Sequence, residues 1–156
     1  MRDIKASLIW ITSILHELNI PFQIAGGLAA RAYGATRELE DIDIDIPKDK
    51  FSLLYNRVKP FVIYGPTQHK DDQWDILLMT INYHDQLIDI GGAHHTKIRG
   101  PQSSDWHLLI TDFNKALPVS MFGVTIPVIS RDALIAYKNI LQRPVDMEDI
   151  KEIIKN

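Results

Sequence analysis

The sequence has no cysteine among its 156 residues. This absence excludes disulfide bonds, thiolate metal sites and thiol nucleophiles, and it is compatible with the cytosol, where we expect the protein to reside. A long hydrophobic run is missing as well, because the apolar stretch from Leu8 to Ile11 is followed by Thr12, Ser13 and Glu17. We therefore expect an amphipathic helix at the N-terminus, and neither a signal peptide nor a membrane span.

The sequence also lacks a large excess of positive or negative charge. The formal net charge is -3, and the sequence is 46% hydrophobic and 24% charged, as in an ordinary globular protein. This balance argues against a protein that covers nucleic acid with most of its surface, although it does not exclude a local basic patch. We expect a single domain over residues 1–156, with a core at about 20–92 and C-terminal helices at about 130–156.

Acidic and isoleucine residues alternate strictly between Asp41 and Ile46. Such alternation predicts a β-strand with two unlike faces, so that the isoleucines face the core and Asp41, Asp43 and Asp45 share the opposite face. Two carboxylates about 4 Å apart repel by roughly 4 kcal/mol at an effective dielectric constant near 20. A divalent cation with carboxylate ligands would offset this repulsion, and a carboxylate pair on one strand suits a two-metal site. The alternative is a solvated acidic face on an edge strand.

A glycine pair precedes the acidic strand. The short predicted strand from Phe22 to Ala25 leads directly into Gly26 and Gly27, and helix-forming residues follow from Leu28. Glycines allow a ligand to approach the backbone closely, and the N–H groups at the start of a helix attract phosphate. A plain tight turn that needs a positive φ angle is the alternative.

Arg37 stands in the predicted loop four residues before Asp41. From there its side chain can reach an anion bound between the glycine pair and the acidic strand. An ion pair with Glu38, Glu40 or an aspartate of the strand is the alternative.

A third carboxylate is expected from a hairpin that joins strands at 74–81 and 86–90. Asp89 stands between Ile88 and Ile90, and an aspartate inside an apolar strand is costly unless it is paired or bound to a metal. Asp75 on the other strand competes for this role. We favour Asp89 because it lies near the end of its strand, where a cleft would open.

The remaining pattern predicts mostly peripheral elements. A strand at 61–64 should stop at Gly65-Pro66 and give way to a polar loop over 67–73, and a hairpin of edge strands is expected at 117–121 and 124–129. Residues 106–110 fit either a strand or a short helix. His94 and His95 are expected in a solvent-facing loop. Helices are expected from Arg131 to about Gln142 and, after Pro144, from Asp146 to the C-terminus.

Together, the Ala25-Gly26-Gly27 turn, the Asp41-x-Asp43 pair and the lone strand aspartate resemble the DNA-polymerase-β-like nucleotidyltransferase superfamily. Arg37 four residues before the pair is similar to the lincosamide nucleotidyltransferases and to the AbiEii-like toxin group. The C-terminal residues Lys138, Arg143, Asp146 and Asp149 resemble the Lys…Arg and Asp-x-x-Asp motifs of the AbiEii-like group.

This resemblance implies an α+β fold, a mixed twisted sheet with helices packed on it. It implies that Asp41, Asp43 and Asp89 bind two Mg²⁺ ions and that the protein transfers a nucleoside monophosphate from a nucleoside triphosphate to an acceptor hydroxyl. Four residues would then hold the triphosphate: Gly26, Gly27, Arg37 and Lys138. The supporting residues around the metals would be Asp45, Arg143, Asp146 and Asp149.

The acceptor stays open between an RNA end and a small molecule such as an antibiotic. AbiEii-like toxins have a larger C-terminal helical region, so the acceptor-binding part is either reduced here or supplied by a partner protein or a second copy of the chain. Two other hypotheses compete with an active enzyme: a non-catalytic nucleotide-binding or regulatory module on the same fold, and a structural domain with an acidic edge.

Overall fold

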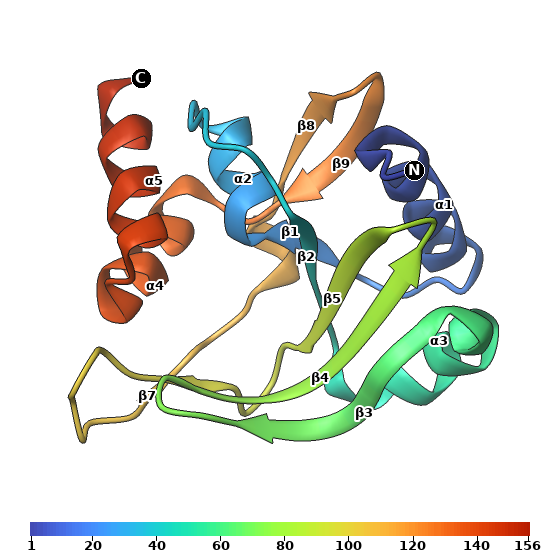
Figure 1. Ribbon diagram of the computed structural model, residues 1–156, viewed down its shortest axis with the longest axis horizontal. Coiled ribbons are helices and arrows are strands. Elements are labelled where there is room, and N and C mark those ends of the chain that lie inside the picture. Colours follow the sequence, from blue (N-terminus) through green and yellow to red (C-terminus); the bar gives the residue numbers. More distant parts are fainter.

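The computed structural model describes residues 1–156 as five α-helices around a nine-stranded sheet (Figure 1). The helices are α1 (Ile4–Glu17), α2 (Gly26–Ala32), α3 (Phe51–Val58), α4 (Arg131–Leu141) and α5 (Pro144–Lys155). The strands are β1 (Gln23–Ala25), β2 (Asp41–Ile46), β3 (Val62–Lys70), β4 (Trp74–Tyr83), β5 (Gln86–Gly92), β6 (Lys97–Ile98), β7 (His107–Leu108), β8 (Leu117–Met121) and β9 (Val124–Val128). None of the helices is both long and apolar enough to cross a membrane.

The sheet is mixed, and its strand order is β7-β6-β4-β5-β2-β1-β9-β8, with β3 also paired to β4. The pairs β2–β5 and β1–β9 are parallel, and the other pairs are antiparallel. The expected α+β architecture is therefore confirmed, and β2 lies in the middle of the sheet.

The two faces of β2 are as different as the alternating sequence predicts. Ile42, Ile44 and Ile46 are buried in the main hydrophobic core, and the three aspartates between them stay partly accessible on the opposite face. Helices α1 and α3 contribute Leu8, Ile11, Leu15, Leu54 and Val58 to this core. Burial of the isoleucines on one face thus determines which way the aspartates point.

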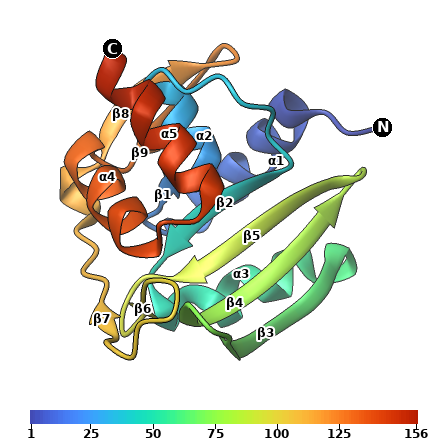
Figure 2. The same ribbon diagram turned by 60° about the vertical axis from the view of Figure 1, so that its left-hand side comes forward.

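The C-terminal helices α4 and α5 form a pair that lies beside α2 (Figure 2). Ser130 caps α4, and its hydroxyl accepts a hydrogen bond from the Ala133 N–H. Helix α5 begins at Pro144 and not at Asp146, because a proline in the first helical turn lacks an N–H that would have no partner there in any case. This pair brings Lys138 and Arg143 to the same cavity as the glycine pair at the start of α2.

Three sequence-based predictions about the periphery of the sheet need correction. Strand β3 does not stop at Gly65-Pro66 but continues to Lys70, so the polar loop predicted for 67–73 is mostly strand. The pairing with β4 shifts register between Tyr64 and Thr67, which lets the chain pass through Gly65 and Pro66 and then resume. Strand β9 is not an edge strand, since it lies between β8 and β1, and β1 pairs with it only at Val128, beyond Pro127.

One question left open by the sequence is answered, and one expectation is confirmed. The 106–110 segment contains a short strand, His107–Leu108, that pairs with β6. His94 and His95 are exposed, as expected for loop residues.

The central position of β2 generates a stability prediction. Ile44→Ala should lower the free energy of unfolding by about 2–5 kcal/mol, because the side chain is only 1% exposed and its removal leaves a cavity in the core. Urea denaturation measures the effect. The matched control is Ile154→Ala on α5, where the side chain is 62% exposed and the change should stay within about 0.5 kcal/mol. Equal effects of the two substitutions would contradict the proposed core.

Candidate active site

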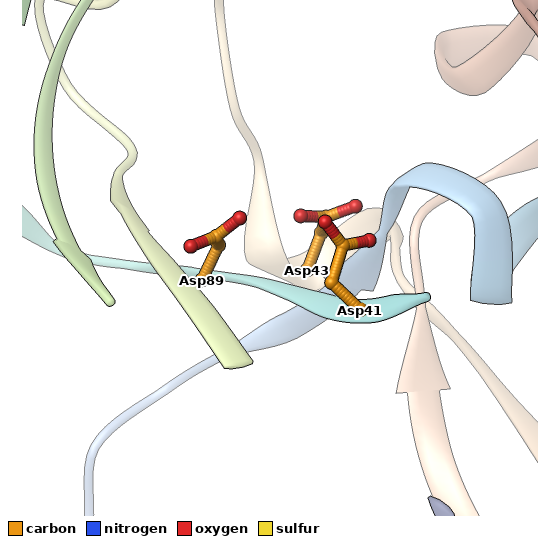
Figure 3. A group of neighbouring side chains, drawn as sticks. All are labelled: Asp41, Asp43 and Asp89. Atoms are coloured by element: carbon orange, nitrogen blue, oxygen red, sulfur yellow. The ribbon is translucent and has the colours of Figure 1, made fainter. Parts of the chain in front are cut away.

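Three carboxylates from two neighbouring strands converge on one face of the sheet (Figure 3). The parallel register of β2 and β5 puts Asp43 directly beside Asp89, and Asp41 lies two residues before Asp43 on the same face. One oxygen from each of these side chains lies within 4.8 Å of the others. We call Asp41, Asp43 and Asp89 the carboxylate trio.

The trio creates a strongly negative site. Burial raises the pKa of Asp43 well above its usual range, and the charges of Asp41 and Asp89 raise that pKa further. Burial also raises the pKa of Asp41, and the charge of Asp89 adds to the effect. Three hard oxygen donors that repel one another in this way fit a divalent cation such as Mg²⁺, which would neutralise them.

A threonine on the next strand orients the third carboxylate. Thr80 on β4 pairs with Asp89 across the sheet, and its hydroxyl donates a hydrogen bond of 2.6 Å to Asp89 Oδ1. The competing candidate, Asp75, is not part of the trio, and its Oδ1 accepts a hydrogen bond from Gln68 on β3. The structure therefore brings Asp89, and not Asp75, next to the Asp41-x-Asp43 pair.

The glycine pair lies against the trio for a steric reason. Gly26 has a φ angle of +60°, and a Cβ atom at this position would collide with Asp43 Oδ2. A Cβ at Gly27 would lie 2.7 Å from Arg37 Nη2. The absence of side chains at both positions thus makes room for a carboxylate of the trio and for the guanidinium group predicted to bind the triphosphate.

Tyr137 on α4 is a neighbour of the glycine pair that sequence reasoning missed. Its hydroxyl accepts a hydrogen bond of 2.7 Å from the Gly26 N–H, and the residue is only 5% exposed. Burial, followed by the charges of Asp43 and Asp45, raises its pKa well above the usual value. The only signal in the sequence is the helical spacing of Leu134, Tyr137 and Leu141 along one buried face, which also describes an ordinary core residue.

Ion pairs with two buried carboxylates attach the C-terminal helices to this region. Arg37 makes two hydrogen bonds to Asp149, of 2.8 and 3.0 Å. Lys138 Nζ lies 3.1 Å from Asp146 Oδ1 and 3.0 Å from Asp149 Oδ2, with a side chain only 1% exposed. Arg143 contacts Asp146 through Nε at 2.7 Å. We call these five residues the C-terminal ion network.

The C-terminal ion network bears on the predicted phosphate contacts. The structure brings Arg37 and Lys138 to the site, but each cation also has a carboxylate partner from α5. Burial would by itself raise the pKa of Asp146, but the hydrogen bonds and positive charges of Arg143 and Lys138 together outweigh it, and the pKa lies below its usual value. Contact between these cations and a triphosphate stays a prediction.

Asp45 lies further along the same face of β2 and is separate from the trio. Its Oδ2 accepts a hydrogen bond of 2.9 Å from Nε2 of the buried Gln23. Burial raises the pKa of Asp45 to about 6. The carboxylate has no ion-pair partner within 4 Å.

The carboxylate trio, Asp45, the glycine pair, Tyr137 and the three cations of the C-terminal ion network line one cavity of about 960 Å³. Its floor is the aspartate face of the sheet, one side is formed by the glycine pair and by Tyr137, and the other side is apolar, with Trp74, Ile76 and Leu78 of β4. Single-ligand pockets usually have about 300–1,000 Å³, so this volume is at the upper end of that range.

Comparison with known proteins places this architecture among solved structures. No family profile matches the chain, and no curated protein matches it. A candidate nucleotidyltransferase from Thermotoga maritima superposes with a TM-score of 0.69 at 18% identity, over 99% of this chain and 96% of that one. The lincosamide antibiotic adenylyltransferase LnuA, with lincomycin bound, gives a TM-score of 0.62 at 17% identity, over 94% of each chain.

The antibiotic-resistance factor ANT(2″)-Ia, in complex with adenylyl-2″-tobramycin, gives a TM-score of 0.64 at 20% identity, over 97% of this chain and 87% of that one. This chain has the nucleotidyltransferase fold. The fold expected from the motifs in residues 25–89 is therefore confirmed along nearly the whole chain. At identities of 20% or less, the similarity is one of fold.

The repulsion within the trio generates a stability prediction. Without added metal at pH 7, Asp43→Asn should raise the free energy of unfolding by at least about 1 kcal/mol, because it removes the cost of burying a charge at this position and also the repulsion from Asp41 and Asp89. Thermal unfolding measures the difference, and Mg²⁺ should stabilise the wild-type chain more than the variant. An Asp43→Asn variant that is less stable than the wild type in metal-free buffer would contradict this electrostatic account.

Lys138 generates a second prediction, because it has a structural partner and a predicted ligand. Lys138→Met should lower the free energy of unfolding by about 3 kcal/mol, the lower end of the range for a broken buried ion pair, since both carboxylates keep their arginine partners. Urea denaturation measures it, with Lys151→Met at an exposed position of α5 as the control. Unchanged stability together with weaker nucleotide binding would show instead that the ammonium group acts mainly on phosphate.

Proposed function

We propose that the protein is a magnesium-dependent nucleotidyltransferase, which moves a nucleoside monophosphate from a nucleoside triphosphate to an acceptor hydroxyl and releases pyrophosphate. The observation that carries this proposal is the carboxylate trio next to the glycine pair. The occurrence of the fold in two antibiotic adenylyltransferases supports it. The proposed catalytic core is about residues 20–92, and residues 130–156 close one side of the site.

The donor atoms of the trio suit Mg²⁺. Asp41 and Asp43 would hold two ions, and Asp89 would complete one of the two sites. When bound, the metal neutralises charge on the phosphates and lowers the pKa of the attacking hydroxyl. Asp45 and the C-terminal residues Arg143, Asp146 and Asp149 do not contact the ions in this proposal, and the three C-terminal residues maintain the shape of the site.

The chain's own residues orient the reactants and exclude water. Gly26, Gly27 and Arg37 bind the triphosphate, and Lys138 contributes positive charge from α4. The acceptor oxygen forms a bond to the α-phosphorus while the bond from that phosphorus to the bridging oxygen breaks, and pyrophosphate leaves with the electron pair. Asp89, oriented by Thr80, assists removal of the hydroxyl proton. Positioning and charge neutralisation supply most of the rate in such reactions.

The third carboxylate provides the decisive experiment. Asp89→Asn should lower the rate of Mg²⁺-dependent pyrophosphate release by at least about a hundredfold, the effect of removing one preorganised charge-stabilising group. The matched control is Asp75→Asn on the neighbouring strand, which should retain the wild-type rate because Asp75 is not part of the trio.

Loss of activity in Asp75→Asn with full activity in Asp89→Asn would overturn the assignment of the third carboxylate. Magnesium–nucleotide binding by the wild-type chain without pyrophosphate release, across a broad panel of acceptors, would identify a nucleotide-binding module and refute the enzyme.

A further inference from the structure

The face of the sheet that carries the trio continues into a second row of residues. Register aligns Gln23, Asp45, Gly91 and Leu78 across strands β1, β2, β5 and β4. This row lies beside the one that contains Asp43 and Asp89, and successive rows on one face of a strand are about 7 Å apart. It lines the same cavity as the trio.

Asp45 has one oxygen available in this row. Its Oδ2 is occupied by Gln23, whereas its Oδ1 lies next to Gly91, 3.5 Å from where a Cβ of that residue would stand. No lysine, arginine or histidine of the chain forms an ion pair with this carboxylate. A partly buried carboxylate with one hydrogen bond and no cation is suited to a positively charged ligand.

An apolar wall adjoins Asp45 on the other side of Gly91. A Cβ at Gly91 would lie 2.9 Å from Ile76 Cδ1, so the glycine keeps the surface open between the carboxylate and Ile76. Trp74, Ile76 and Leu78 alternate along β4, all line the cavity, and none is fully buried. This part of the cavity offers one anionic group and a continuous apolar surface.

The charges around the cavity do not suit an RNA acceptor. Besides the trio, which the proposed Mg²⁺ ions would neutralise, four carboxylic acids line it, namely Glu38, Glu40, Asp45 and Asp71. Of the lysine and two arginines that line it, Arg37 and Lys138 are assigned to the triphosphate, and Arg143 is paired with Asp146. RNA binding depends mainly on cations that are free to contact phosphates. The acceptor side has an excess of negative charge instead.

We propose that the acceptor is a small amphipathic amine that carries the reactive hydroxyl. Its hydroxyl reaches the trio, its ammonium group binds Asp45 about 7 Å away, and its apolar part packs on Trp74, Ile76 and Leu78. This inference depends on the proposed nucleotidyl transfer and adds the chemical class of the acceptor.

Label transfer from α-labelled ATP in the presence of Mg²⁺ tests the acceptor class with the full wild-type chain. The probes are lincomycin and tobramycin as hydroxylated amines, maltotriose as a neutral polyol, and an oligoribonucleotide with a free 3′-hydroxyl. Label should appear on at least one of the two amines, and not on maltotriose or RNA. Label on RNA or maltotriose, or absence of both labelling and calorimetric binding for both amines, overturns the proposal.

Asp45→Asn tests the residue itself. For the labelled amine, KM should rise roughly tenfold to a hundredfold, as expected when a charge-assisted hydrogen bond is removed, whereas KM for ATP should stay within about twofold. The matched control is Asp72→Asn, an exposed aspartate that does not line the cavity. An unchanged acceptor KM, or equal increases for amine and ATP, contradicts the role of Asp45. Circular dichroism checks the fold of both variants.

Failure of this inference can be distinguished from failure of the proposed function. Pyrophosphate release that requires Asp89, with label on RNA alone, leaves the nucleotidyltransferase in place and removes the amine acceptor. Absence of magnesium–ATP binding by the wild-type chain refutes both.

Discussion

Three like charges held within 4.8 Å of one another are the constraint on which the rest of the site depends. Each pair at such a separation repels by roughly 3–4 kcal/mol at an effective dielectric constant near 20, so the chain must spend folding free energy to keep the carboxylates together. That free energy comes from the opposite face of the same strands, where Ile42, Ile44 and Ile90 are buried in the core. Because side chains alternate along a strand, burial of the isoleucines forces the aspartates to share the other face. Site and core are therefore two sides of the same sheet.

The space around the trio is limited by backbone as much as by side chains. Gly26 approaches Asp43 so closely that no Cβ fits between them, and the Tyr137 hydroxyl accepts a hydrogen bond from the N–H of the same glycine. The glycine pair is thus more than a tight turn, the alternative that the sequence alone left open, although Gly26 does have the positive φ that such a turn requires. The C-terminal helices also contribute to this region of the site. Helix α4 supplies Tyr137, and the C-terminal ion network joins α4 and α5 to Arg37.

Sequence reasoning succeeded where a pattern has one physical explanation. The alternation in β2 predicted both faces of the strand, and the lone aspartate between Ile88 and Ile90 predicted a carboxylate that the structure does bring next to Asp43. It failed where the outcome depends on neighbours. Gly65 and Pro66 normally end a strand, yet β3 continues past them because β4 offers a partner in a shifted register. Lys138 and Arg37 are visible in the sequence as charges, but their partners lie on another element, α5, at least eight positions away in the chain, and no spacing rule predicts them.

Residue chemistry and local periodicity were enough to predict the ligand types and their alternation along β2, and the fold class came from the resemblance of the motifs to a known superfamily. The pairing of distant groups became visible only in the folded chain: Thr80 with Asp89, Tyr137 with Gly26, and Asp45, which has no ion-pair partner, next to an apolar wall. The physical reason is that strand pairing and helix packing join residues through register and shape. Neither property can be calculated from the residues of one segment without the segment that packs against it.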